Sequence, residues 1–162
     1  MSMVALVVAL LGAVPLAAQS TARSKSGLPD PPKKDVPYLI HADVLVETES
    51  SEAQEETRKE EQVYTVAGAT ARVKTPLAGP EFLLESEALA PNKLSLYKME
   101  SKAGRREVVL AKKKKPVAKP IVLSVFRVHD KIFKIRVDES LESGEYCLSP
   151  DGSNAVFCFA VE

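Results

Sequence analysis

The stretch EYCLSPDGSNAVFCFAV, residues 145–161, decides the fold because two apolar runs flank a turn-rich centre. The centre, residues 151–154, contains the Asp-Gly pair that is typical of tight turns between antiparallel strands. Pairing that is symmetric about this turn brings large apolar residues together on one face of a hairpin. The predicted pairs on that face are Leu148 with Phe157 and Tyr146 with Phe159.

The same pairing places Cys147 opposite Cys158 on the other face. Directly opposed residues of a non-hydrogen-bonded antiparallel pair have Cα atoms about 4.5 Å apart, close to the separation that a disulfide needs. We therefore expect a disulfide in an oxidising compartment. The alternatives, a reactive thiol pair or a metal site, lack support because the chain has no Cys-x-x-Cys, and His41 and His129 lack zinc-ligand spacing. The hairpin is expected to close the fold, with any binding site elsewhere.

Just before the hairpin, Leu141, Gly144 and Tyr146 form the pattern Leu-x-x-Gly-x-Tyr. This pattern resembles the tyrosine corner of immunoglobulin-like and fibronectin type III-like domains, here of the kind found in exported bacterial proteins. The resemblance implies that the Tyr146 hydroxyl bonds to upstream backbone, and that the domain is a binding, adhesive or structural module. The chain differs from true immunoglobulin domains because Cys147 directly follows the tyrosine and the sequence has no Trp.

Outside the hairpin, alternating apolar residues from Tyr38 to Val46 predict one strand with a buried face. Further short apolar runs are separated by loops rich in proline and glycine. The predicted strands are Gln62–Val66, Glu81–Glu85, Leu94–Glu100, Arg106–Leu110, Ile121–Val128, Ile132–Val137, Glu145–Leu148 and Val156–Val161. Many short strands joined by turns favour two packed antiparallel sheets. The sequence thus predicts an all-β fold, an immunoglobulin-like β-sandwich.

Two further hairpins can be aligned by counting outward from their turns. One turn is centred on Ala103-Gly104 and the other on Asp130-Lys131. Both alignments place apolar residues together on one face. The predicted pairs are Tyr97 with Leu110, Met99 with Val108, Val128 with Phe133, and Phe126 with Ile135.

Three regions follow one another along the chain. Residues 1–19 have an apolar core, Pro15 and a small-residue end, the pattern of a cleaved signal peptide, with the cut after Gln19, Ser20 or Ala22. The alternative is a buried N-terminal strand or helix. Residues 20–37 are rich in Pro, Lys and Ser and predict a flexible linker. Residues 38–162 form the predicted domain, so we expect a secreted or periplasmic protein.

Charge is balanced over the chain, with 22 basic and 22 acidic residues, but it is distributed unevenly. Residues 47–61 are strongly acidic and residues 102–119 strongly basic. Within the acidic stretch, Glu55 and Lys59 have helical spacing, so residues 49–62 predict a charged surface loop or a short surface helix.

The basic stretch is the candidate site for a polyanion or an envelope surface. Its residues are Arg105, Arg106, Lys112, Lys113, Lys114, Lys115 and Lys119. Aromatic residues do not interleave with these lysines, which disfavours stacking on nucleic-acid bases. The alternative is a solvated loop kept polar for solubility.

Catalytic motifs are not found: there is no Gly-x-Ser-x-Gly, His-Glu-x-x-His or Gly-rich phosphate loop. His129 beside Asp130 could serve as an acid/base pair, but a turn is the simpler interpretation. The segment Asp151–Asn154 could hold weak calcium, yet it lacks the carboxylate spacing of calcium loops. We expect no catalytic residue, cofactor, metal ion or transmembrane segment in the mature chain. The sequence therefore favours a non-catalytic binding or structural module over a polyanion-binding protein.

Overall fold

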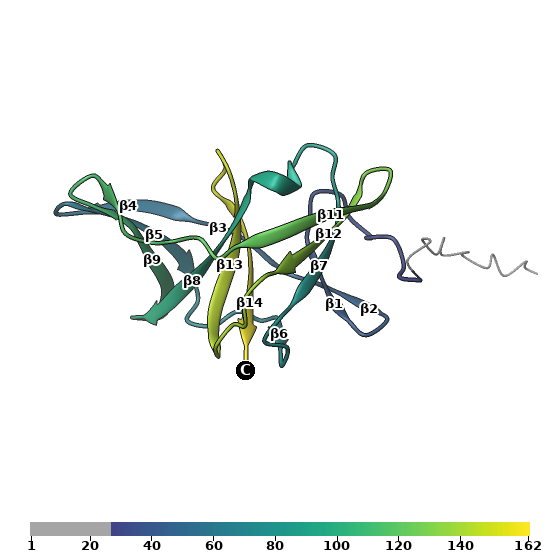
Figure 1. Ribbon diagram of the computed structural model, residues 1–162. Coiled ribbons are helices and arrows are strands. Elements are labelled where there is room, and N and C mark those ends of the chain that lie inside the picture. Colours follow the sequence, from purple (N-terminus) through teal and green to yellow (C-terminus); the bar gives the residue numbers. More distant parts are fainter. Residues whose placement is uncertain (1–26) are drawn as a thin grey trace, which may run out of the picture.

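Short strands separated by tight turns build almost the entire structure, a computed structural model that describes residues 27–162. Two sheets pack on each other (Figure 1), which confirms the predicted all-β sandwich. The predicted signal peptide, residues 1–19, lies outside the described residues, as do residues 20–26 of the predicted linker. The immunoglobulin-like relationship implied by the tyrosine corner stays a prediction.

The smaller sheet has five antiparallel strands. Their spatial order is β11 (Leu123–His129), β12 (Ile132–Val137), β7 (Glu81–Glu85), β1 (Tyr38–His41) and β2 (Val44–Glu47). Strands β1 and β2 correct the prediction of one strand over residues 38–47: the chain reverses at Ala42, whose φ is 52°. The reversal changes which side chains share a face, so Leu39 enters the core with Val46.

The larger sheet contains most of the remaining strands. Its order is β3 (Glu49–Glu52), β14 (Ala155–Val161), β13 (Gly144–Pro150), β8 (Leu94–Lys102), β9 (Arg105–Lys112), β5 (Glu61–Ala67) and β4 (Gln54–Arg58). Three short elements complete the fold: β10 (Lys115–Pro116) beside β9, β6 (Lys74–Thr75) beside β14, and the 3-10 turn η1 (Pro91–Lys93). Since β3 and β4 follow each other along the chain yet form the sheet's opposite ends, the sheet curls around an interior.

The prediction of a charged loop or short helix over residues 49–62 is wrong. These residues form strands β3 and β4 and the start of β5. Strand pairing decides this, because Glu55 lies opposite Tyr64 and Glu56 opposite Val63 in the β4–β5 hairpin. Charged side chains at such an edge are common, since they discourage pairing with other chains. The helical spacing of Glu55 and Lys59 is coincidental.

The end of the predicted linker also belongs to the domain. Lys34 forms a bridge with Glu85, and the Asp35 carboxylate accepts hydrogen bonds from three backbone N–H groups at residues 87–89. Burial raises the pKa of Asp35, but these three hydrogen bonds outweigh it and lower that pKa below its ordinary value of 3.8. The domain thus begins before Tyr38, because a side-chain cap gives this polar segment a fixed partner.

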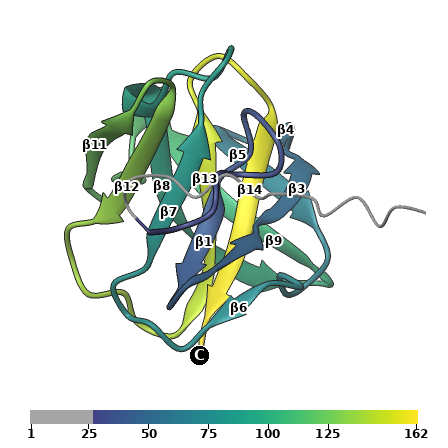
Figure 2. The same ribbon diagram turned by 90° about the vertical axis from the view of Figure 1, so that its right-hand side faces the viewer.

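The C-terminal hairpin separates two cores, and Figure 1 shows β13 and β14 in the middle of the molecule. Figure 2 views the molecule from the side of the smaller sheet. The first core lies between the sheets; its buried residues are Leu39, Phe82, Leu84, Leu94, Leu96, Ile135, Val137, Leu141, Tyr146, Leu148, Phe157, Phe159 and Val161. The second core lies inside the curled sheet; its buried residues are Ala53, Val66, Ala71, Met99, Cys147, Val156, Cys158 and Ala160.

The predicted hairpin pairing is confirmed in full. Leu148 pairs with Phe157 and Tyr146 with Phe159, and both pairs face the first core. Cys147 and Cys158 form the predicted disulfide on the opposite face. The Tyr146 hydroxyl donates a hydrogen bond to the carbonyl oxygen of Glu142 (2.8 Å), the upstream backbone contact that the tyrosine-corner pattern implies.

The other two hairpin alignments hold only near their turns. Lys102 pairs with Arg105 as the turn at 103–104 predicts, but β8 leaves β9 beyond Glu100, so the predicted pairs farther from the turn do not form. At the turn 130–131, a β-bulge between Arg127 and His129 shifts the alignment by one residue. Phe126 therefore lies opposite Lys134 instead of Ile135 and is 45% exposed.

Candidate functional site

The divergence of β8 from β9 opens a cavity inside the curled sheet. Residues 94–99 of β8 pair with β13 instead of β9, whereas β9 stays paired with β5 along its whole length. The chain returning from β10 bonds to the free side of β8, where the N–H of Ile121 donates to the carbonyl oxygen of Leu96 (2.8 Å). The inward-facing side chains of β8 and β9 are thereby held apart across the interior of the curled sheet.

We call this cavity the cup; its volume is about 450 Å³. About half of the residues that line it have apolar side chains: Ala53, Tyr64, Val66, Leu94, Tyr97, Met99, Val108, Leu110, Cys147 and Val156. Polar residues surround its mouth: Asn92, Lys93, Ser95, Ser149, Asp151, Ser153 and Asn154. Four wall side chains, Tyr64, Tyr97, Val108 and Leu110, are only half-buried, so the apolar interior is open to solvent on one side.

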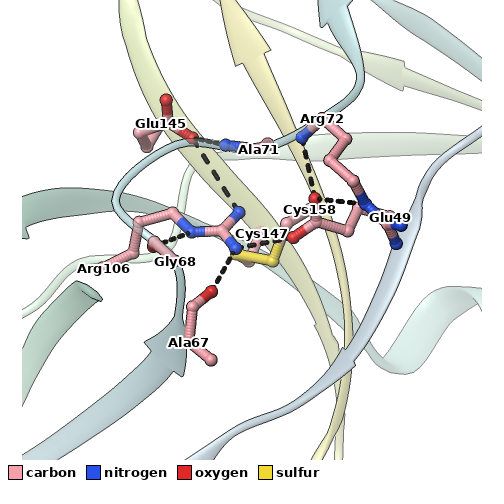
Figure 3. Close-up of a disulfide and its surroundings, with 9 residues drawn as sticks. All are labelled: Glu49, Ala67, Gly68, Ala71, Arg72, Arg106, Glu145, Cys147 and Cys158. Atoms are coloured by element: carbon pink, nitrogen blue, oxygen red, sulfur yellow. Dashed lines mark hydrogen bonds and ion pairs between the residues drawn. A yellow bond between two sulfur atoms is a disulfide. The ribbon is translucent and has the colours of Figure 1, made fainter. Parts of the chain in front are cut away.

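The far end of the second core is closed by a buried ion cluster (Figure 3). Arg106, 1% exposed, lies between two carboxylates: its Nη2 donates to Glu49 Oε1 at 2.6 Å, and its Nη1 is 3.9 Å from Glu145 Oε2. The guanidinium also donates to the backbone carbonyl oxygens of Ala67 (2.7 Å) and Gly68 (3.0 Å). The curled sheet is thus sealed by charge at one end and open at the other.

The two carboxylates also hold the loop that follows β5. Glu145 accepts a hydrogen bond from the N–H of Ala71 (2.8 Å), and Glu49 accepts one from the N–H of Arg72 (2.7 Å). Burial raises the pKa of Glu49, but the hydrogen bonds from Arg72 and Arg106 outweigh it and hold that pKa below its ordinary value of 4.5. Every charge in the cluster has an internal partner, which indicates a structural seal.

The mouth of the cup is built on two connected turns. Pro91 starts η1 with its φ already suited to a helical turn, and the N–H of Lys93 donates to the carbonyl oxygen of Ala90 (3.0 Å). The N–H of Asp151, in the C-terminal hairpin turn, donates to the carbonyl oxygen of Lys93 (3.0 Å). The backbone of Lys93 is therefore fixed on both sides at the rim.

The acidic and basic stretches of the sequence meet in neighbouring strands and neutralise each other. Lys112 of β9 pairs with Glu61 of β5 (3.0 Å), and Lys113 lies 3.6 Å from Glu60. Arg105 forms an ion pair with Glu56 of β4 (2.9 Å). The sequence indicates one acidic and one basic surface, but strand pairing brings residues 47–61 beside residues 102–119. Many of their charges therefore form ion pairs with each other.

The candidate polyanion surface is accordingly smaller than predicted. Arg106 is excluded from it because it is buried in the ion cluster. The lysine run lies at the end of a hairpin within one sheet, where Lys113 and Lys114 form a tight turn with φ values of 49° and 63°. Three of the seven candidates remain exposed without an ion pair among residues 27–162: Lys114, Lys115 and Lys119.

The remaining sequence candidates do not assemble into a reactive site. His129 Nε2 lies 3.6 Å from Asp30 Oδ1, and His129 Nδ1 lies 3.9 Å from Asp130 Oδ2, distances too long for hydrogen bonds. The segment Asp151–Asn154 forms the hairpin turn and the rim of the cup. Residues 27–162 contain no cluster of three or more His, Cys, Asp or Glu side chains suited to a metal ion.

Sequence reasoning missed the cup although it grouped four of the side chains that line it. The alignment about Ala103-Gly104 correctly groups Tyr97 and Met99 with Val108 and Leu110 on one face, and all four line the cavity. It could not show that β8 leaves β9 and pairs with β13. As a result, the apolar side chains of β8 and β9 do not pair directly but lie on opposite sides of the cavity. The C-terminal hairpin, expected only to close the fold, supplies one wall and part of the rim.

The chain matches no family model, no curated protein and no solved structure. Among residues 27–162, no helix has the length and apolar character required to cross a membrane.

Proposed function

We propose that the protein is a non-catalytic binding module of an extracytoplasmic compartment and that the cup holds a small, largely apolar ligand. The observation that carries this proposal is the open cavity of about 450 Å³ in whose wall two tyrosines and two aliphatic side chains remain half-buried. Leaving such side chains uncovered forgoes roughly 25 cal/mol for each Å² of apolar surface. The cavity volume falls within the roughly 300–1,000 Å³ that is typical of small-molecule sites.

Two features support the compartment. The protein contains the Cys147–Cys158 disulfide, and disulfides persist in oxidising compartments but are rare in the cytosol. The apolar leader predicted over residues 1–19 would direct export. Detection of the mature protein outside the cytoplasm, with its N-terminus near residue 20, would test this part of the proposal; a cytoplasmic product that retains Met1 would overturn it.

The ligand proposal can be tested with Nile red, an uncharged apolar dye whose fluorescence rises in apolar surroundings. We expect saturable binding by the purified protein and its loss in Leu110→Arg, because a charged side chain would fill the cup. Val117→Arg is the matched control, since Val117 is 50% exposed and does not line the cavity. Equal binding by the two variants, or no binding by the unmodified protein, would overturn the proposal. Circular dichroism verifies that both variants fold.

A polyanion-binding role is the second proposal, and it now depends on Lys114 and Lys115 of the β9–β10 hairpin and on Lys119 just after it, which form no ion pair with residues 27–162. Replacing all three with Ala should release the protein from heparin at lower salt. The control is Lys112→Ala with Lys113→Ala, whose ammonium groups already lie near Glu61 and Glu60. Equal elution of all variants would remove this role.

A further inference from the structure

The charge at the mouth of the cup indicates which apolar ligand would bind. Lys93 is the only cationic residue among those that line the cup. It also lines a second cavity, of about 460 Å³, that shares Pro150, Asp151 and Ser153 with the first. Lys93 therefore stands at the junction of the two cavities, where a ligand entering either one would meet it.

The side chain of Lys93 is exposed at the mouth of the cup. Several lysines form ion pairs, such as Lys74 with Glu162, Lys98 with Glu142 and Lys134 with Glu81, whereas Lys59, Lys114, Lys115, Lys119 and Lys131 form none with residues 27–162. The ammonium group of Lys93 forms no ion pair or hydrogen bond with residues 27–162. The hydrogen bonds that fix its backbone leave its charge available at the rim.

The rest of the mouth adds hydrogen-bond donors. The side-chain amides of Asn92 and Asn154 and the hydroxyl of Ser95 lie on the rim. A carboxylate accepts hydrogen bonds and carries a negative charge that can pair with the Lys93 ammonium group. It therefore suits this combination of donors and cation. Asp151 is the one rim residue of opposite charge. It lies at the tip of the hairpin turn, and its short side chain reaches less far than the four-carbon stem of lysine.

From this arrangement we infer that the cup takes an apolar acid, with its hydrocarbon or aromatic body against Tyr64, Tyr97 and Leu110 and its carboxylate at Lys93. The inference rests on the proposed ligand-binding function and adds the chemical class of the ligand. The lysine stem can also cover part of the apolar body, since its methylene groups lie along apolar surface while the ammonium stays in water.

The test compares naphthylacetate with naphthylacetamide, two compounds of equal shape that differ in charge, by isothermal titration calorimetry. We expect the acid to bind roughly tenfold more tightly, a ratio that corresponds to one charge-assisted contact. Lys93→Met should abolish this preference and leave the affinity for the amide within about twofold of that of the unmodified protein. Asp151→Asn should increase the preference for the acid, because it removes a negative charge that repels the ligand carboxylate. Lys131→Met is the control, because Lys131 is exposed, forms no ion pair with residues 27–162 and does not line the cup.

The outcomes separate the two proposals. Equal affinity for acid and amide would overturn the inference and leave the cup as a site for neutral apolar ligands. A preference that persists in Lys93→Met would assign the acid to another cation and would also overturn it. Weaker acid binding in Asp151→Asn would contradict the assignment of charges at the rim. Binding of neither compound, together with a negative result for Nile red, would overturn the proposed function itself.

Discussion

The two cores on either side of the C-terminal hairpin differ in how completely they are filled. The first contains large side chains in close contact, with the Phe159 ring 5.2 Å from that of Phe82 and 5.7 Å from that of Tyr146. The second contains small residues, a disulfide, a buried ion cluster and an open cavity. One hairpin thus supports a packed side that stabilises the fold and an open side that is free to bind.

The largest expected loss of stability comes from the first core. Phe159→Ala should lower the free energy of unfolding by about 3–5 kcal/mol, because it removes a ring held between two others and leaves a cavity. Urea denaturation measures this. Phe126→Ala is the control: Phe126 is 45% exposed and touches Arg136, so its loss should cost less than about 1 kcal/mol. Similar losses for both variants would contradict the proposed contrast between filled and open regions.

The ion cluster should give the next largest effect. Arg106→Met keeps much of the side-chain volume but leaves the buried carboxylates of Glu49 and Glu145 without their shared cation, which should cost about 3 kcal/mol. Arg105→Met on the neighbouring residue removes ion pairs of a partly exposed guanidinium with Glu56 and Glu107, of which Glu107 keeps Arg58 as a partner, and should cost less than about 1 kcal/mol. If both substitutions cost the same, the cluster does not seal the second core.

The disulfide should contribute somewhat less. It joins residues only 11 positions apart, so replacing both Cys147 and Cys158 with Ala should cost about 2–3 kcal/mol. Thermal unfolding of the double variant, compared with the oxidised unmodified protein, measures this contribution. If the double variant were as stable as the oxidised protein, the bond would not stabilise the fold.

Acid should weaken the second core through Glu49. Because the pKa of Glu49 is lower in the folded protein than its ordinary value of 4.5, its stabilising effect is complete above that value. The effect disappears as the pH falls below about 4.5 towards the folded pKa. We therefore expect Glu49→Gln to lose less stability than the unmodified protein between neutral pH and about pH 3.5. An identical loss in both proteins, measured by urea denaturation at each pH, would contradict this role.

The smallest stability change should come from the wall of the cup. Leu110→Ala should cost less than about 1 kcal/mol, because the side chain already borders an open cavity. Leu96→Ala, in the first core and fully buried, should cost about 2–5 kcal/mol. The Leu110 variant should nevertheless weaken Nile red binding, which separates a binding role from a packing role. Equal destabilisation by both substitutions would indicate that the cup closes in solution.

The sequence determines a feature of this protein where one turn governs the strands on both sides of it. Residues 151–154 fix the pairing of the last two strands, and alternation then places Tyr146 with Phe159 on one face and Cys147 with Cys158 on the other. The same reasoning fails across 38–47 and near His129, where a turn at Ala42 and a β-bulge change which residues share a face.

Only the tertiary structure decides the cup and the pairing of charges, because both depend on which strands far apart in the sequence become neighbours. β8 pairs with β13 instead of continuing along β9, and this choice opens the cavity between Tyr97 and Leu110. β5 pairs with β9, and this choice brings the acidic stretch to the basic one. Alternation along a strand shows which residues share a face, but strand order decides what that face meets.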